Sequence, residues 1–425
     1  MDTPDVVNDA VAIQNAIKST RHLKLRRIYY SASKLALPVD NVGYVVEGIN
    51  TRFTGIRSGA PDYALEAIGA NASSPAGDTY IFRNVLFYST NSESKGIKLQ
   101  SLAKVVVEDC KFSGFNGGEQ LVLNQIFDSW FNRTYWTSHA PNGNFPTVLI
   151  DSGSVDNSNN LRFDGCAWES TNYEDVRIVQ STGAIANYMI MFDKCKFESQ
   201  PSNAKVNLES GIVLSLIFDT CIFGDNSTVN PVIKMGTSAA ARDLRVSKSR
   251  VVYKTNTLIP VFFALDNAVN SSFVDLALIT GAGGVASAAT VTANTVNHYS
   301  IGISLNTTAH TSFFNTSATS AVIVNSPVRL AAKNGNATLE QYRYDSANTL
   351  VGRSKQVINA SGGLEFYIDE VLQFTVQKNL PQFSMLGTRY GTATAAATPV
   401  NTVFIDSSDG KLKFKDAGGT VNLLY

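Results

Sequence analysis

The sequence is poor in charged residues and has no excess of either sign. Only 16% of its 425 residues are charged, and 35 Lys and Arg balance 35 Asp and Glu. A chain without net charge has no overall field that attracts nucleic acid or an anionic membrane, so we expect neither as a partner. No apolar run has the length of a membrane span, and no signal peptide is recognisable.

Cysteine and histidine are also scarce, with four of each. The cysteines form no CxxC pair and none is paired with a histidine, so the spacing of a metal site is missing. Segment 281–284 is rich in glycine, but it lacks the Lys-Ser/Thr and the helix of a phosphate-binding loop. We therefore expect neither a metal nor a cofactor.

What the sequence does contain is an eight-residue phrase that recurs through its first two thirds. Each of the four cysteines follows an Asp or Glu by two residues and precedes a Phe or Trp by two residues. Four fainter copies place the equivalent residue, which we call the marker, at positions 85, 130, 249 and 277. The period is about 28 residues, which is the length of a solenoid repeat. The full copies have their markers at Cys110, Cys166, Cys195 and Cys221.

Each copy contains two short alternating apolar runs, and a further run precedes it, so three strands per coil are expected. This pattern predicts an all-β fold, a parallel β-helix in which equivalent residues lie about 4.8 Å apart on neighbouring coils. The marker and the aromatic residue two positions later should face inward in columns. Buried small hydrophobes are the preferred interpretation of the cysteines, although neighbouring coils also bring Cys166, Cys195 and Cys221 within disulfide reach. The chain should bend just before the marker, at Asp109, Ser129, Gly165, Lys194, Thr220 and Lys248.

Four segments are expected along the chain. Residues 1–55 hold a capping helix over about 8–17 and a first coil, and residues 56–285 form the β-helix with a catalytic groove. Residues 281–295 read as a linker that opens a C-terminal β-rich module over 286–400, with a hairpin over 364–376. Residues 401–425 form a β-meander with turns at Asp409-Gly410 and Gly418-Gly419.

Both ends of the chain resemble a known family. The run Ala-Ile-Gln-Asn-Ala-Ile at 12–17, followed by Val-Val-Glu-Gly at 45–48, resembles the start of pectate-lyase-like right-handed parallel β-helices, in particular phage tailspike depolymerases. The tail over 403–425 resembles that of tailspikes from phages of encapsulated Acinetobacter. The sequence departs from the family at 7–10, where Val-Asn-Asp-Ala replaces the usual Asp-Asp-Thr opening.

The resemblance implies a homotrimer of side-by-side β-helices that cuts bacterial capsular polysaccharide. It also implies a virion protein, made in the bacterial host cytoplasm and attached to the phage tail or baseplate through an N-terminal domain that this sequence lacks. It does not assign catalytic residues. In a trimer, the catalytic groups can come from one subunit or from two.

Carboxylates recur at two positions of the phrase. Glu169 and Glu198 lie three residues after the marker on neighbouring coils, and Asp225 lies close to the same position on the next coil. Glycoside hydrolysis uses two carboxyl groups, about 5 Å apart in retaining enzymes and about 6.5–9.5 Å apart in inverting ones. Glu169 with Glu198 matches the first spacing, and Glu169 with Asp225 matches the second. Two residues before the marker, Asp164 and Asp193 are further catalytic candidates, or they bond backbone amides and hold the bends.

The long interval between the markers at 130 and 166 predicts a loop over 133–144, either a surface excursion or a sugar-binding wall. Trp136 and His139 in this loop, and Tyr173, Glu174 and Arg177 beyond it, are the expected substrate-binding residues; the Arg can hold a sugar carboxylate. Three functions remain open: a hydrolase, a lyase with His139, Tyr173 or a Lys as base and Arg177 as clamp, and a non-enzymatic receptor-binding spike.

Overall fold

The protein is described from a computed structural model. It describes residues 8–39, 42–69, 79–152, 157–180, 186–226, 229–255, 257–265, 270–280, 285–291, 297–301, 304–306, 314–316, 322–325, 337–344, 350–358, 364–368, 371–376, 402–405 and 408–423. Within these ranges no helix is both long and apolar enough to cross a membrane.

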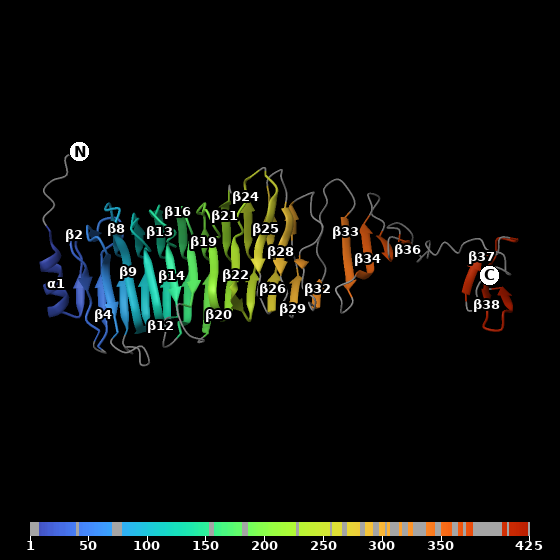
Figure 1. Ribbon diagram of the computed structural model, residues 1–425, viewed down its shortest axis with the longest axis horizontal. Helices are drawn as coiled ribbons and strands as arrows, with labels where there is room; N and C mark the ends of the chain where they lie inside the picture. The colour runs from blue at the N-terminus through green and yellow to red at the C-terminus, as the bar shows by residue number, and fades with distance from the viewer. Residues whose placement is uncertain are drawn as a thin grey trace. The chain divides into compact units, whose positions relative to one another are not determined.

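The first unit, Met1–Arg329, is a parallel β-helix with three strand columns, as the repeat predicts (Figure 1). Two columns belong to one 21-stranded sheet because β12 and β20 each run through both, and the third column is a separate 11-stranded sheet. The first column is β3 (Leu35–Ala36), β6 (Tyr63–Ile68), β9 (Lys95–Ala103), β12 (Leu121–Asn132), β14 (Val148–Asp151), β17 (Val176–Val179), β20 (Val206–Asp219), β22 (Ile233–Ala241), β25 (Ile259–Leu265), β28 (Val285–Val291) and β31 (Phe314–Thr316).

The second and third columns carry the repeated phrase. The second is β1 (His22–Lys24), β4 (Tyr44–Glu47), β7 (Tyr80–Arg83), β10 (Val105–Glu108), the end of β12, β15 (Asn159–Asp164), β18 (Asn187–Asp193), the end of β20, β23 (Leu244–Ser247), β26 (Asn270–Val274), β29 (Asn297–Ile301) and β32 (Val322–Asn325). The third is β2 (Ile28–Ser31), β5 (Gly55–Ser58), β8 (Leu86–Ser89), β11 (Lys111–Ser113), β13 (Tyr135–His139), β16 (Ala167–Thr171), β19 (Lys196–Phe197), β21 (Ile222–Asn226), β24 (Arg250–Tyr253), β27 (Ala277–Ile279) and β30 (Ser304–Asn306).

Stacked aromatic rings fill the core between the columns. Neighbouring rings in one ladder have centroids 4.6–5.9 Å apart, and those in a second ladder 4.6–5.0 Å apart, which adds ring stacking to the burial of apolar area. The four cysteines are buried beside them as free thiols, so the prediction of small core residues is confirmed. The ladders are Phe87, Phe112, Trp136, Trp168, Phe197 and Phe223, and Phe131, Phe163, Phe192 and Phe218.

The bend before each marker is confirmed, with one correction to the register. The bend residue has a φ between 45° and 61° in eight coils, at Asn84, Asp109, Arg133, Gly165, Lys194, Thr220, Lys248 and Asp275. Asn132 pairs with Glu108, so Arg133 takes the bend predicted for Ser129, and the marker is Thr134 instead of residue 130. Arg250 pairs with Ala277, which likewise moves the last marker from 277 to Leu276.

The two ends of the first unit differ in how well they were predicted. Helix α1 (Ala10–Ser19) buries Ile13 and Ile17 as expected of a cap, and the Asn8 side chain accepts a hydrogen bond from the Ala10 amide at 3.1 Å. Parallel pairing does not stop near 285, because β28 to β32 extend both sheets of the β-helix to Asn325. The Gly281–Gly284 part of the expected linker lies outside the described residues.

The second unit, Leu330–Tyr425, contains two antiparallel sheets. The expected hairpin over 364–376 is the pair β35 (Leu364–Ile368) and β36 (Val371–Val376), in one sheet with β33 (Ala337–Tyr344) and β34 (Leu350–Ile358). The expected meander is β37 (Thr402–Ile405), β38 (Leu412–Lys415) and β39 (Val421–Leu423). Its two turns contain Gly410 and Gly419, which have φ of 69° and 83°.

Candidate functional site

Glu169 and Glu198 lie side by side on the outer face of the third column. Trp168 of β16 pairs with Phe197 of β19, and the Glu198 amide donates to the Trp168 carbonyl at 2.8 Å. Their side chains are 35% and 27% exposed, so solvent and ligands can reach both. The Lys196 Nζ lies 2.6 Å from Glu198 Oε2 and 3.8 Å from Glu169 Oε1.

Tyr135 completes this group, which we call the carboxylate cluster (Tyr135, Glu169, Lys196 and Glu198). Its hydroxyl donates a hydrogen bond to Glu169 Oε2. Burial and this hydrogen bond raise the pKa of Tyr135 to about 12, so the phenol keeps its proton at neutral pH. The cluster therefore contains two carboxylates, one cation and one neutral proton donor within contact distance.

The other carboxylates of the prediction lie elsewhere. Asp193 accepts contacts at 3.1 Å from both Arg162 and Lys194, and Asp164 lies 3.9 Å and 3.8 Å from the same two cations. Two of these pairs, Arg162 with Asp193 and Lys194 with Asp164, link neighbouring coils near the bend. Asp225 is in strand β21, and its side chain lies outside the described part of the structure.

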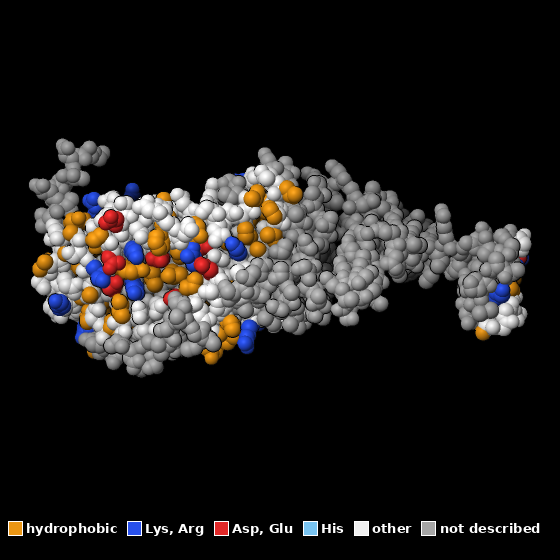
Figure 2. All heavy atoms as spheres, viewed as in Figure 1, with side chains coloured by type: hydrophobic (Ala, Val, Ile, Leu, Met, Phe, Trp, Pro, Cys, Tyr) orange, Lys and Arg blue, Asp and Glu red, His pale blue; other side chains and the backbone are white. Residues whose placement is uncertain are grey.

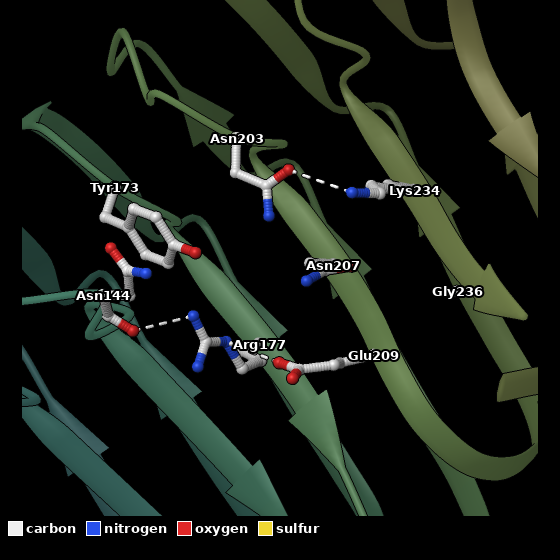
Figure 3. Close-up of a pocket in the computed structure, with 8 residues that line it drawn as sticks. All are labelled: Asn144, Tyr173, Arg177, Asn203, Asn207, Glu209, Lys234 and Gly236. Atoms are coloured by element: carbon white, nitrogen blue, oxygen red, sulfur yellow. Dashed lines mark hydrogen bonds and ion pairs between the residues drawn. The ribbon is translucent and has the colours of Figure 1, made fainter. Parts of the chain in front are cut away.

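A second polar feature lies on the outer face of the first column and in the loops that precede it. A cavity of about 290 Å³, shown in Figure 3, adjoins one of about 250 Å³, and Asn144 and Tyr173 line both. We call the two together the polar groove. Its remaining lining residues are Arg177, Asn203, Asn207, Glu209, Lys234 and Gly236 in the larger cavity, and Pro141, Asn142, Gly143, Asn172 and Ser202 in the smaller one.

Strand register places three polar side chains in line along the groove. Arg177 of β17 pairs with Asn207 of β20, which pairs with Lys234 of β22. Each lies between two buried apolar residues of its strand, which fixes it on the outer face. Arg177 Nη2 donates to the Asn144 carbonyl at 2.8 Å, and Arg177 Nε lies 3.1 Å from Glu209 Oε2.

Glu174 lies beneath the groove with a fully buried side chain. Its Oε1 accepts hydrogen bonds from Asn203 Nδ2 at 2.6 Å and Asn207 Nδ2 at 2.7 Å, and its Oε2 accepts one from Arg177 Nε at 2.5 Å. Burial raises its pKa, and the neighbouring Arg177 opposes that shift. The prediction that Glu174 contacts substrate is therefore corrected: it holds three groove residues in place.

Two more predicted substrate-binding residues are in the interior. Trp136 and His139 are both 0% exposed, because residues 135–139 are strand β13 and not part of a long loop. Trp136 stacks between Phe112 and Trp168, and His139 is bonded to the Gly118 carbonyl at 2.8 Å and Thr147 Oγ1 at 3.1 Å. Neither side chain can form a sugar-binding wall.

Tyr173 and Arg177 do line the groove, whereas Asn207, Glu209 and Lys234 were missed. The sequence contained a signal for two of them. Val-Arg-Ile at 176–178, Val-Asn-Leu at 206–208 and Ile-Lys-Met at 233–235 share one pattern, a polar residue between two apolar ones ahead of each repeated phrase.

The burial of His139 predicts acid sensitivity. Burial lowers its pKa to about 4, so the folded protein stays unprotonated at this site while the unfolded chain binds a proton below its ordinary pKa of 6.5. The contribution of His139 to the free energy of unfolding is fully present above pH 6.5 and is lost as the pH falls toward 4. This loss amounts to at most about 3 kcal/mol. Urea titrations at several pH values should show a smaller acid loss for His139→Gln than for the wild type.

The comparison also controls for other buried groups. Burial raises the pKa of Glu174 and of Asp175, and these shifts change stability with the opposite sign, but both proteins contain them. The difference between the two titrations therefore isolates His139. Equal slopes for both proteins would contradict the assignment.

In the described part of the chain, neither the carboxylate cluster nor the polar groove has the ligand arrangement of a metal site. Among the described residues, no group of three or more His, Cys, Asp or Glu is arranged to hold a metal ion. On the face shown in Figure 2, basic and acidic side chains lie close together with hydrophobic ones between them. The larger cavity of the groove is itself lined by two basic side chains, Arg177 and Lys234, and one acidic side chain, Glu209.

Comparisons with known proteins identify the fold. No protein family description and no curated protein matches the sequence. The chain is similar to ORF18 of Geobacillus virus E2, with 20% identity, a TM-score of 0.63, and coverage of 99% of this chain and 83% of that one. This similarity shows the β-helix fold.

Two other solved structures are similar to this chain at a lower TM-score. The tailspike of Acinetobacter phage vB_ApiP_P1 is 12% identical with a TM-score of 0.47, over 96% of this chain and 81% of that one. The catalytic unit of a GH87 α-1,3-glucanase from Streptomyces thermodiastaticus is 12% identical with a TM-score of 0.47, over 76% and 66%. Neither is close enough in structure to assign a function.

Proposed function

We propose that this protein is a phage tailspike that binds and depolymerises a bacterial capsular polysaccharide. The observation that carries the proposal is the polar groove, where an aromatic ring, amides, two cations and a carboxylate line adjoining cavities of a rigid β-helix. Each cavity is just below the usual 300–1,000 Å³ of ligand sites, and an open series of such cavities suits a chain of sugars better than one compact ligand.

Hydrolysis at the carboxylate cluster is the proposed reaction. The coil that supplies Glu169 also supplies Tyr173 of the groove, four residues later, and the next coil supplies Glu198 and Asn203. A polysaccharide that crosses this turn can engage both features. The Lys196 ammonium is closer to Glu198 and stabilises negative charge there, which suits a base or nucleophile and leaves Glu169 as the proton donor.

A lyase is the second candidate, because the groove presents two cations. Arg177 and Lys234 can neutralise the carboxylate of a uronic acid. This neutralisation makes the C–H proton on the carbon next to the carboxylate more acidic, so that a base can remove it. Tyr173 is then the candidate base, since the burial of His139 removes it from this role.

The proposed assembly is a homotrimer that belongs to the virion tail, after synthesis in the host cytoplasm. A row of apolar side chains on the outer face of the second strand column supports side-by-side packing of subunits. Strand pairing aligns Ile81, Val106 and Trp130 on successive coils, followed after Arg162 by Met191 and Ile217. These apolar side chains are partly exposed, and Trp130 is 39% exposed.

Trp130→Glu should dissociate the trimer. A charge at a subunit interface would lose its hydration without gaining a partner, so the mass in sedimentation velocity should fall from trimer to monomer. Leu258→Glu is the control, because Leu258 is 52% exposed and outside this apolar column. An unchanged trimer in the Trp130 variant would place the interface on another face.

The test of the function is depolymerisation. Purified capsules from a panel of bacterial strains are incubated with the protein and separated by size-exclusion chromatography. We expect one capsule type to shift to oligosaccharide size and the others to stay intact. Binding of a capsule without any change in polymer size would instead support a receptor-binding spike.

A further inference from the structure

The polar groove contains a cation without a carboxylate partner. Lys234 Nζ contacts only the Asn203 Oδ1 at 3.3 Å among the described residues, although its side chain is partly buried and lines the larger cavity. Arg177, by contrast, is paired with Glu174 and Glu209. An uncompensated cation in a partly desolvated cavity is a site for an anion.

The second cation is held in a fixed orientation. Arg177 Nε contacts the two glutamates, Nη2 donates to the Asn144 carbonyl, and the guanidinium lies 5.2 Å from the centre of the Tyr173 ring. These contacts use Nε and Nη2, so Nη1 is the nitrogen that can reach a ligand. Arg177 and Lys234 are two strands apart in one column, about 10 Å at the backbone, and both line the larger cavity. In Figure 3 the Arg177 guanidinium points toward Asn144 and the Lys234 ammonium toward Asn203, with Asn207 on the strand between them.

Buried Glu174 sets the direction of the amides between these cations. Because it accepts the Nδ2 groups of Asn203 and Asn207, the Oδ1 atoms of both amides must point away from it. The Asn203 Oδ1 is bonded to Lys234, and the Asn207 Oδ1 is available to accept from a sugar hydroxyl. The groove therefore offers positive charge and a hydroxyl acceptor side by side.

We infer that the polar groove recognises an acidic sugar, with the sugar carboxylate between Lys234 and Arg177 and a neighbouring hydroxyl on Asn207. This inference rests on the proposed function and narrows its substrate class to polysaccharides whose repeat unit carries a carboxylate. Glu174 is a positioning residue of this site. Lys234 is the specificity-determining residue, since its charge has no other carboxylate to neutralise among the described residues.

The test uses the capsule that the protein cleaves, and oligosaccharides released from it. Binding of these oligosaccharides is measured by calorimetry before and after their carboxyl groups are reduced to alcohols. We expect reduction to weaken binding to the wild type about tenfold or more, and Lys234→Gln to weaken binding of the unreduced form by a similar factor. The variant should bind reduced and unreduced forms with similar affinity, and added salt should weaken only wild-type binding of the acidic form.

Lys98→Gln is the matched control, because Lys98 lies in the same outward column three strands before Arg177 and outside the groove. Its affinity should equal that of the wild type. A cleaved capsule without acidic sugars, or equal binding of reduced and unreduced oligosaccharides by the wild type, would overturn the inference and leave the depolymerase proposal intact. If no capsule is bound or cleaved, the proposed function fails, and the inference fails with it.

Discussion

Glu169→Gln and Glu198→Gln should each lower the rate of capsule cleavage by about 10²- to 10⁴-fold, which is the usual contribution of a positioned acid or base. Each substitution keeps the size of the side chain and removes its ability to transfer a proton. Both side chains are partly exposed on the outer face, where they contact Lys196 and where Glu169 also accepts the hydrogen bond from the Tyr135 hydroxyl, so the buried core should be unaffected. Initial rates of reducing-end release on the susceptible capsule, together with calorimetric binding of that capsule, measure the effect.

The control is Glu93→Gln, at an exposed residue in the turn before β9, and it should retain the wild-type rate. Asp193→Asn tests the competing hypothesis that Asp193 is a catalytic carboxylate. In the structure Asp193 pairs with Arg162 and Lys194, which favours a structural role at the bend, so its loss should reduce stability more than rate. Full activity in both glutamate variants would remove the carboxylate cluster from the mechanism and turn attention to Glu209 and the lyase candidate.

Phe197→Ala should destabilise the protein by about 3–5 kcal/mol, the usual cost of truncating a buried aromatic side chain. Phe197 is 0% exposed and stacks on Trp168 at 4.6 Å and on Phe223 at 5.0 Å. Its removal leaves a cavity in the middle of the ladder, and the neighbouring coils cannot close it because their spacing is set by strand pairing. The midpoint of guanidinium denaturation should fall accordingly.

Phe53→Ala makes the same chemical change at a side chain that is 64% exposed, and it should cost no more than about 0.5 kcal/mol. Comparable losses in the two variants would show that the aromatic ladder is not what stabilises the β-helix. Because residue 198 is the proposed base, Phe197→Ala should also slow cleavage, and the size of that effect reports how strictly the ladder positions Glu198.

The repeat could be predicted because its copies share chemically distinctive residues at the same positions. A Cys followed by Phe or Trp in successive copies fixes both the inward columns and the bend, and the four cysteines confirm this. The register was wrong where the copies lose that signal. Thr134 is a polar residue at a marker position, so the apolar alternation just before it was mistaken for the phrase, and the β13 residues Trp136 and His139 were assigned to a loop.

The boundary of the β-helix was missed for a related reason. Strand β28 is rich in Ala, Ser and Thr and carries no repeated phrase, yet it pairs in parallel with β25. Backbone hydrogen bonds between coils do not require the side chains that define the phrase. A repeat can therefore continue structurally after its sequence signal has faded.

The polar groove was only half predicted, because it depends on register between coils of unequal length. Arg177 and Tyr173 were recognised as single residues, whereas Asn207 and Lys234 gain meaning only from the pairing of β17, β20 and β22. The buried position of Glu174 has the same origin. Its carboxylate is enclosed by Asn203 and Asn207 from the next coil.

Mass spectrometry of the fragments released from a susceptible capsule tests the central claim most directly. The proposed hydrolase predicts fragments at the mass of the repeat unit plus one water, without ultraviolet absorbance from a new double bond. Fragments lacking that water and carrying the double bond would contradict hydrolysis at Glu169 and Glu198 and assign the chemistry to a lyase. Capsules that are bound and remain intact across the panel would contradict the enzymatic account altogether.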